Sequence, residues 1–210
     1  METEFQTTLH FCDATDEERA TIYENLGFRR INVLKGLNEK SAASKAAGID
    51  VSAIDENGKN ITISEKILDR RYASMLEKRV PVELYSDFEN KAQGWLRTSS
   101  AMTVFYFFTD AVVSIELAPL REFIDQLYEE STVEDEITEL VNTFIEHGVS
   151  GKHLDGKDGV GIYVFTKENG HHSVGLMLNP DELPDESMDV TEYYFEEEEG
   201  ADEEEGGVES

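Results

Sequence analysis

Alternating and helical patterns of apolar side chains run through the first third of the chain. Apolar residues recur at helical spacing between a capping box at residues 15–18 and Gly27, which predicts a short amphipathic helix. The alternating segments 48–54 and 60–66 flank Asn57-Gly58, a dipeptide typical of tight β-hairpin turns. The sequence therefore predicts a helix followed by a hairpin.

The remaining patterns predict a mixed domain. Continuous or alternating apolar runs favour strands at 28–33, 82–85, 103–108, 112–117, 161–165 and 173–178. Helical spacing favours helices at 67–78, 120–129 and 133–147, and residues 35–47 are interpreted as a surface loop. This order predicts an α/β or α+β fold with one mixed central sheet flanked by helices.

Acidic residues concentrate at the C-terminal end. Residues 181–210 hold 15 of the 46 Asp and Glu residues and no Lys or Arg. Such a segment repels itself and offers little apolar surface to bury. We therefore predict a single domain over residues 1–180, with its end near Pro180, and a disordered acidic tail over residues 181–210.

The net charge of −28 argues against simple sliding along DNA, because that binding relies on Lys and Arg displacing counterions. Three interpretations of the acid excess stay open: solubility, a partner-binding or self-inhibiting tail, and mimicry of nucleic acid. The single cysteine, Cys12, excludes an internal disulfide and fits a reducing compartment. With no basic and apolar leader and no apolar run of membrane-spanning length, we expect a cytoplasmic protein without a membrane partner.

The hairpin carries the candidate chemistry. Asp50 lies on its first strand, and Glu65 and Lys66 lie on its second, with Glu83 on the next strand along the chain. A divalent ion that assists phosphodiester cleavage needs hard oxygen ligands, and a neighbouring lysine can stabilise charge on the phosphate. Side chains alternate on a strand, so Lys66 and Glu65 point to opposite faces, and the register decides which face Asp50 joins.

Four short segments together resemble a known superfamily: Gly48-Ile49-Asp50-Val51, Ile63-Ser64-Glu65-Lys66, Val82-Glu83-Leu84 and Gly94-Trp95-Leu96. They are similar to the restriction-endonuclease-like, or PD-(D/E)xK, superfamily, and more narrowly to uncharacterised phage and mobile-element members of it. The resemblance covers about half of the chain, from residue 15 to residue 117. It implies a nuclease-like protein acting on DNA or RNA by hydrolysis that depends on Mg²⁺ or Mn²⁺.

The resemblance also implies roles for individual residues. Asp50 becomes the first metal ligand and Lys66 the lysine of the acid-x-Lys triplet, whose acid position is occupied by Ser64. A hydroxyl does not replace a carboxylate as a ligand of similar strength. Two alternatives follow. In the first, Glu65 or Glu83 supplies the missing acid, and an acid on the first helix (Glu17, Glu18 or Glu24) contributes a further ligand. In the second, the domain keeps the fold and has lost cleavage.

Structural interpretations compete with each functional one. The pattern around the hairpin also fits ordinary solvated strand residues at Asp50, Glu65 and Lys66. The basic pair Arg70 and Arg71 either holds a phosphate backbone or balances nearby acids. His171-His172 is a weak metal-binding candidate, because adjacent histidines point apart and no spaced partner is evident in the sequence.

The rival function is a non-catalytic interaction protein that binds a host or replication protein through its acidic tail or an acidic face. The oligomeric state stays open, with a homodimer as one option.

Overall fold

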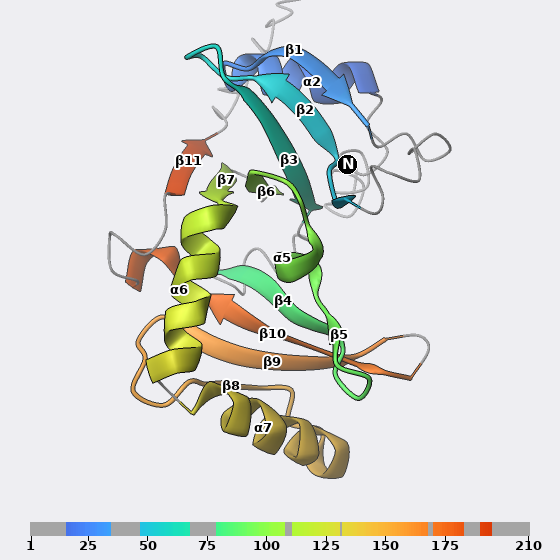
Figure 1. Ribbon diagram of the computed structural model, residues 1–210, viewed down its shortest axis with the longest axis vertical. Helices are drawn as coiled ribbons and strands as arrows, with labels where there is room; N and C mark the ends of the chain where they lie inside the picture. Colours follow the sequence, from blue (N-terminus) through green and yellow to red (C-terminus); the bar gives the residue numbers. More distant parts are fainter. Residues whose placement is uncertain are drawn as a thin grey trace, which may run out of the picture.

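The computed structural model describes residues 16–34, 47–67, 79–107, 111–130, 132–167, 170–182 and 190–194. These residues form an α+β fold built on two β-sheets (Figure 1). The prediction of mixed helix and strand content is confirmed. The prediction of one central sheet is wrong, because the strand that carries Glu83 belongs to a second sheet.

Sheet A contains six strands in the order β1-β2-β3-β6-β7-β11. Their bounds are β1 Arg29–Val33, β2 Val51–Ile54, β3 Asn60–Ile67, β6 Thr103–Phe107, β7 Ala111–Glu116 and β11 Val190–Tyr194. Strands β3 and β6 are parallel, and the other neighbouring pairs are antiparallel. The parallel pair is formed by a long excursion of the chain, which builds part of sheet B before it returns as β6.

Sheet B contains five antiparallel strands in the order β5-β4-β10-β9-β8. Their bounds are β5 Ala92–Gln93, β4 Val80–Asp87, β10 His172–Leu178, β9 Val160–Thr166 and β8 Gly151–His153. Strand β4, from the middle of the chain, lies between β5 and β10. Sheet B therefore joins the region of Glu83 to the predicted strand at 173–178, more than 80 residues away in sequence.

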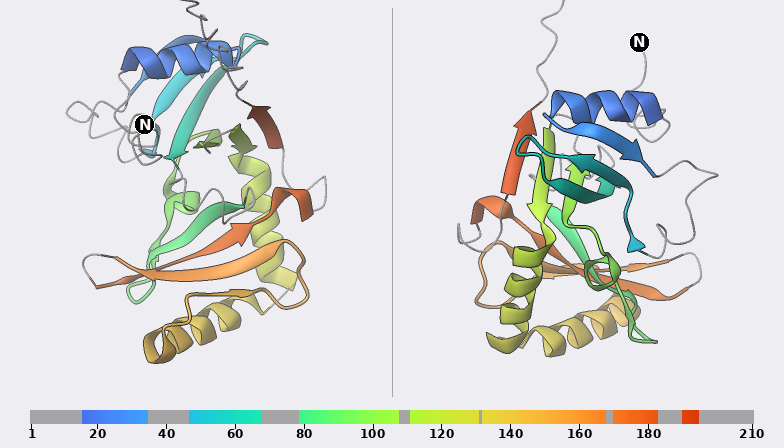
Figure 2. Two further views of the ribbon diagram at one scale, coloured as in Figure 1. Left: turned by 180° about the vertical axis from the view of Figure 1, so that it is seen from behind. Right: turned by 45° about the horizontal axis from the view of Figure 1, so that its top comes forward.

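Helices cover both sheets, as the two views of Figure 2 show. Helix α2 (Asp16–Asn25) packs on sheet A, and the short α5 (Trp95–Thr98) connects β5 to β6. Helices α6 (Leu117–Glu130) and α7 (Val133–His147) lie beside sheet B. The short 3-10 helix η1 (Pro180–Glu182) follows β10. Gly148 ends α7 in the left-handed conformation, with φ of 72°, which a glycine adopts without steric cost.

Two groups of buried side chains form the interior. The smaller group lies between α2 and one face of sheet A, where Tyr23 and Phe28 contact the rings of Phe105 and Phe107. The larger group joins the other face of β6 and β7 to sheet B, α6 and α7. Sheet A is therefore covered on both faces at β6, which explains the continuous apolar run Thr103–Phe107.

The β2-β3 hairpin forms as its sequence predicts. Val51 and Ala53 pair with Ile63 and Ile61, and all four side chains are buried against α2. Asp55 Oδ1 accepts the N–H groups of residues 57 and 59, which fixes the turn. The alternation in sequence thus selects the face that packs on α2.

The fold continues beyond the predicted domain end. Strand β11 pairs along β7, with Val190 opposite Ile115, so five residues of the predicted tail form the edge of sheet A. The boundary near Pro180 is therefore too early. Residues 195–210, the predicted helix from residue 68 onward and the loop at 35–46 lie outside the described residues. Within the described part of the chain, each helix is too short or too polar to cross a membrane.

Candidate functional site

The hairpin register places Asp50 beside Ser64. Val51 pairs with Ile63, and the Asp50 N–H donates to the Ile63 carbonyl at 2.8 Å. Because side chains alternate, Asp50 and Ser64 share one face of sheet A. Asp50 Oδ2 accepts the Glu65 N–H at 2.8 Å and lies 3.4 Å from Ser64 Oγ. The Asp50 carboxylate is thereby anchored on the backbone of β3, with the residue only 5% exposed.

Lys66 extends from the same face as Asp50. Its ammonium lies 4.7 Å from the centroid of the Trp95 ring, within the range of a favourable cation–π contact. Trp95 packs edge-on against Tyr106, whose hydroxyl donates to the Pro81 carbonyl at 2.8 Å. Lys66 is therefore held by α5 where sheet A approaches the start of β4.

Glu65 points to the opposite face, toward α2. Its Oε1 accepts the hydroxyl of Tyr23 at 2.9 Å, and the residue is 4% exposed. Its neighbour on β6 is Phe105, which belongs to the interior under α2. The structure thus separates the two carboxylates predicted to bind metal, since Asp50 and Glu65 lie on opposite faces of sheet A.

Replacing Tyr23 by phenylalanine is expected to lower the free energy of unfolding by about 2 kcal/mol, because it removes a hydrogen bond from a buried carboxylate. Denaturant unfolding measures this change. Tyr85→Phe is the matched control, because Tyr85 donates to the exposed Glu134. Equal stability of Tyr23→Phe and the unmodified chain would show that the hydrogen bond from Tyr23 to Glu65 does not stabilise the fold.

Glu83 lies on sheet B and is held by three donors. Its Oε1 accepts Lys167 Nζ at 3.0 Å and Ser173 Oγ at 2.8 Å, and its Oε2 accepts the Trp95 N–H at 3.2 Å. Glu83 therefore fixes the backbone of the residue whose ring lies under Lys66. The Glu83 carboxylate is connected to the Asp50 face only through Trp95. This placement fits a residue that positions Trp95 better than one that binds a metal ion.

The other predicted site residues fall outside this geometry. Arg70 and Arg71 lie outside the described residues, as do the side chains of Glu17 and Glu18. Glu24 is exposed on α2.

Lys167 and Ser173 were missed by sequence reasoning. They lie on either side of the turn that joins β9 to β10, and the sequence places them only near the predicted strands 161–165 and 173–178. Their link to Glu83 depends on the pairing of β10 with β4.

Converging metal-ligand atoms occur elsewhere in the described part of the chain. Side-chain ligand atoms of Asp87, Glu89 and His171 all lie within 4.8 Å of one another. The carboxylates of Asp50, Glu65 and Glu83 do not form such a group there.

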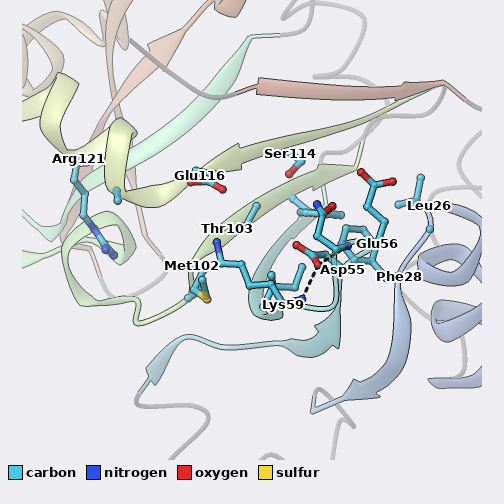
Figure 3. A pocket seen from close by; sticks show the side chains of 16 residues that line it. Leu26, Phe28, Asp55, Glu56, Lys59, Met102, Thr103, Ser114, Glu116 and Arg121 are labelled. Atoms are coloured by element: carbon cyan, nitrogen blue, oxygen red, sulfur yellow. Dashed lines mark hydrogen bonds between the residues drawn. The ribbon is translucent and has the colours of Figure 1, made fainter. Parts of the chain in front are cut away.

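A cavity of about 740 Å³ lies beside the C-terminal end of α2, and Figure 3 shows its lining. Thr103, Ser114 and Glu116 line it from β6 and β7, and Lys59 lines it from the hairpin turn. Thr103 shares this face of β6 with Phe105, which packs under α2. The cavity is therefore on the opposite face of sheet A from Asp50 and Lys66, and it is not part of the same site.

Comparison with known proteins gives no match to this chain among family models, curated proteins or solved structures. The resemblance to restriction-endonuclease-like proteins rests on the four sequence segments given above.

Proposed function

We propose that this chain is a phage or mobile-element protein with a restriction-endonuclease-like domain that hydrolyses phosphodiester bonds in nucleic acid with the help of Mg²⁺ or Mn²⁺. The observation that supports this most is the shared face of Asp50, Ser64 and Lys66. The hairpin register gives Asp50 and Lys66 the common orientation that the superfamily pattern requires.

The donor set on this face fits a hard divalent ion. Mg²⁺ is commonly bound by one or two carboxylates, with waters and substrate phosphate as further ligands. Asp50 supplies one anchored carboxylate, and the Ser64 hydroxyl lies beside it. When bound, such an ion activates water and offsets charge on the phosphate. Asp50 is the residue that would hold it.

Lys66 supplies the second element of the proposed chemistry. A lysine ammonium near the scissile phosphate stabilises the negative charge that increases during cleavage. The Trp95 ring restricts the ammonium, and Glu83 fixes the Trp95 backbone. Lys66 therefore approaches substrate in a preset orientation, which reduces the cost of ordering it.

Ser64 is the position where an acid is expected to increase activity. Ser64→Glu adds a second carboxylate beside Asp50, and we expect metal affinity and cleavage rate to rise about tenfold, since ligand charge governs divalent-ion affinity. Titration of cleavage against Mg²⁺ and Mn²⁺ measures the change. Ser114→Glu is the control, because Ser114 lies on the opposite face of sheet A, lining the cavity. An equal effect of both substitutions would contradict the proposed site.

The rival function is non-catalytic binding of a host or replication protein. It is favoured by the position of Glu65, which contacts Tyr23 on the face opposite Asp50, and by the acid-rich segment 181–210. Under this function, neutralising the acids of residues 196–205 abolishes capture of a specific partner, and Ser64→Glu produces no cleavage. The rival function would be excluded if the chain still captured its partner after these acids were neutralised and the unmodified chain showed metal-dependent cleavage.

A further inference from the structure

Two turns meet at one end of sheet B. One follows β4 and contains Phe88 to Lys91, and the other joins β9 to β10 just before His172. Figures 1 and 2 show both turns at the same end of the sheet. The Phe88 N–H donates to the His172 carbonyl at 2.9 Å, which fixes the turns to each other. Side chains that are more than 80 residues apart in sequence are thereby brought together.

The two turns bring oxygen and nitrogen ligands close together. His171 Nδ1 lies 3.4 Å from Asp87 Oδ2, and the ligand atoms of these residues and of Glu89 are mutually within 4.8 Å. Ligands of a tetrahedral zinc ion, bound at about 2.0–2.2 Å, are separated from one another by about 3.4 Å. The His171–Asp87 separation already matches that value, and it exceeds the length of a good hydrogen bond.

We propose that Asp87, Glu89 and His171 form a binding site for a divalent transition-metal ion, with Zn²⁺ as the preferred ion. One imidazole and two carboxylates are a donor set that zinc accepts, and the fourth position is open to water. This site is separate from the Asp50 face and does not depend on the proposed nuclease function. It links the two turns of sheet B.

Neighbouring groups orient the proposed ligands. The His172 N–H donates to Glu89 Oε2 at 3.1 Å, and the His172 ring contacts Glu89 Oε1. The N–H and side-chain amide of Asn90 donate to Asp87 at 3.0 and 2.8 Å. Such outer contacts fix ligand geometry in metal sites. His172 is itself packed edge-on against the ring of Phe144.

Hydrogen bonds from neighbouring groups also act on the pKa of both carboxyl groups. The hydrogen bond from Asn90 lowers the pKa of Asp87. Burial raises the pKa of Glu89, the hydrogen bonds that its carboxylate accepts, among them those from His172, lower it, and the net pKa is lowered.

The adjacent histidines do point to different partners, as the sequence indicates, with His171 toward Asp87 and His172 toward Glu89. The spaced partners that the sequence did not reveal come from the turn after β4.

Zinc binding by the full chain tests the proposal. Competition with a chromophoric zinc chelator is expected to show one equivalent of bound Zn²⁺. His171→Ala and Asp87→Asn are each expected to weaken this binding at least tenfold, and His172→Ala about tenfold. The control variant His153→Ala changes an exposed histidine on β8 and should leave the affinity unchanged. Asp50→Asn should also leave it unchanged, which distinguishes this site from the proposed nuclease site.

A thermal unfolding scan without metal shows whether each variant is folded. The Zn²⁺ affinities of the variants that are folded, among His171→Ala, His171→Gln and Asp87→Asn, are then compared with that of the unmodified chain. The proposal also predicts that Zn²⁺ raises the unfolding temperature of the unmodified chain, because an ion that binds only the folded state stabilises it. Failure to bind one equivalent of Zn²⁺, or equal affinity in the folded variants and the unmodified chain, would overturn the proposal.

Discussion

Lys66→Met is expected, under the proposed function, to reduce nucleic-acid cleavage by about 10²–10³-fold while the protein stays folded, a loss typical of removing one group that stabilises transition-state charge. Methionine keeps much of the length and apolar character of the lysine stem, so contact with the Trp95 ring is retained and the ammonium is lost. Single-turnover cleavage of labelled DNA and RNA measures the effect, and circular dichroism checks the fold.

Two further lysine variants sharpen this result. Lys59→Met removes an exposed ammonium at the turn of the same hairpin and is expected to change cleavage less than threefold. Lys66→Arg should recover little activity, because a planar guanidinium can stack on the Trp95 ring but spreads its charge over three nitrogens and does not place a compact charge where the ammonium lies. Equal activity of Lys66→Met and the unmodified chain would remove Lys66 from the site.

Gly94→Ala is expected to lower the free energy of unfolding by about 3 kcal/mol, at the upper end of the usual cost of overpacking. A Cβ on Gly94 would lie 2.3 Å from the Glu83 carbonyl oxygen and 2.6 Å from its carbonyl carbon. Both are backbone atoms of β4, which cannot move aside as the end of a flexible side chain can. The substitution therefore forces β4 and α5 apart, and Trp95 moves with α5.

Gly151→Ala is the matched control for this stability effect. A Cβ on Gly151 has a single backbone neighbour, the Ile162 carbonyl oxygen, at 3.3 Å. We expect a cost below about 1 kcal/mol there, because one small shift relieves the contact. Denaturant unfolding of both variants gives the comparison. Equal stabilities would show that β4 and α5 do not pack as closely as Gly94 indicates.

Local elements of the fold follow from local sequence patterns. The β2-β3 hairpin was predictable because Asn57-Gly58 defines the turn and alternating apolar residues define the buried face. Helices α6 and α7 were predictable because their apolar residues recur at helical spacing over several turns. These patterns depend on neighbours within about ten residues, so no tertiary information is needed to identify them.

Pairing between distant strands was not predictable in the same way. Strand β4 has the length and composition of a strand that fits either sheet, and its partners β5 and β10 decide that it joins sheet B. Strand β11 lies in an acid-rich segment whose composition alone favours a tail, yet it pairs along β7. The relevant hydrogen bonds join segments far apart in sequence, which composition does not encode.

The candidate site was partly predictable. Alternation alone places Ser64 and Lys66 on one face and Glu65 on the other, but the face of Asp50 depended on a register that one residue of slip would reverse. The partners of Glu65 and Glu83 depended on tertiary contacts, with Tyr23 in one case and with Lys167 and Ser173 in the other.

Cleavage by the full chain and by Asp50→Asn, in Mg²⁺, in Mn²⁺ and in a chelator, tests the proposed nuclease site most directly. Asparagine keeps the shape of Asp50 and an oxygen to accept the Glu65 N–H, but it removes the charge that would hold the ion. The proposed function predicts cleavage of DNA or RNA that requires metal and falls by at least about a hundredfold in Asp50→Asn. Absence of cleavage in every condition, or equal cleavage by both proteins, would contradict it.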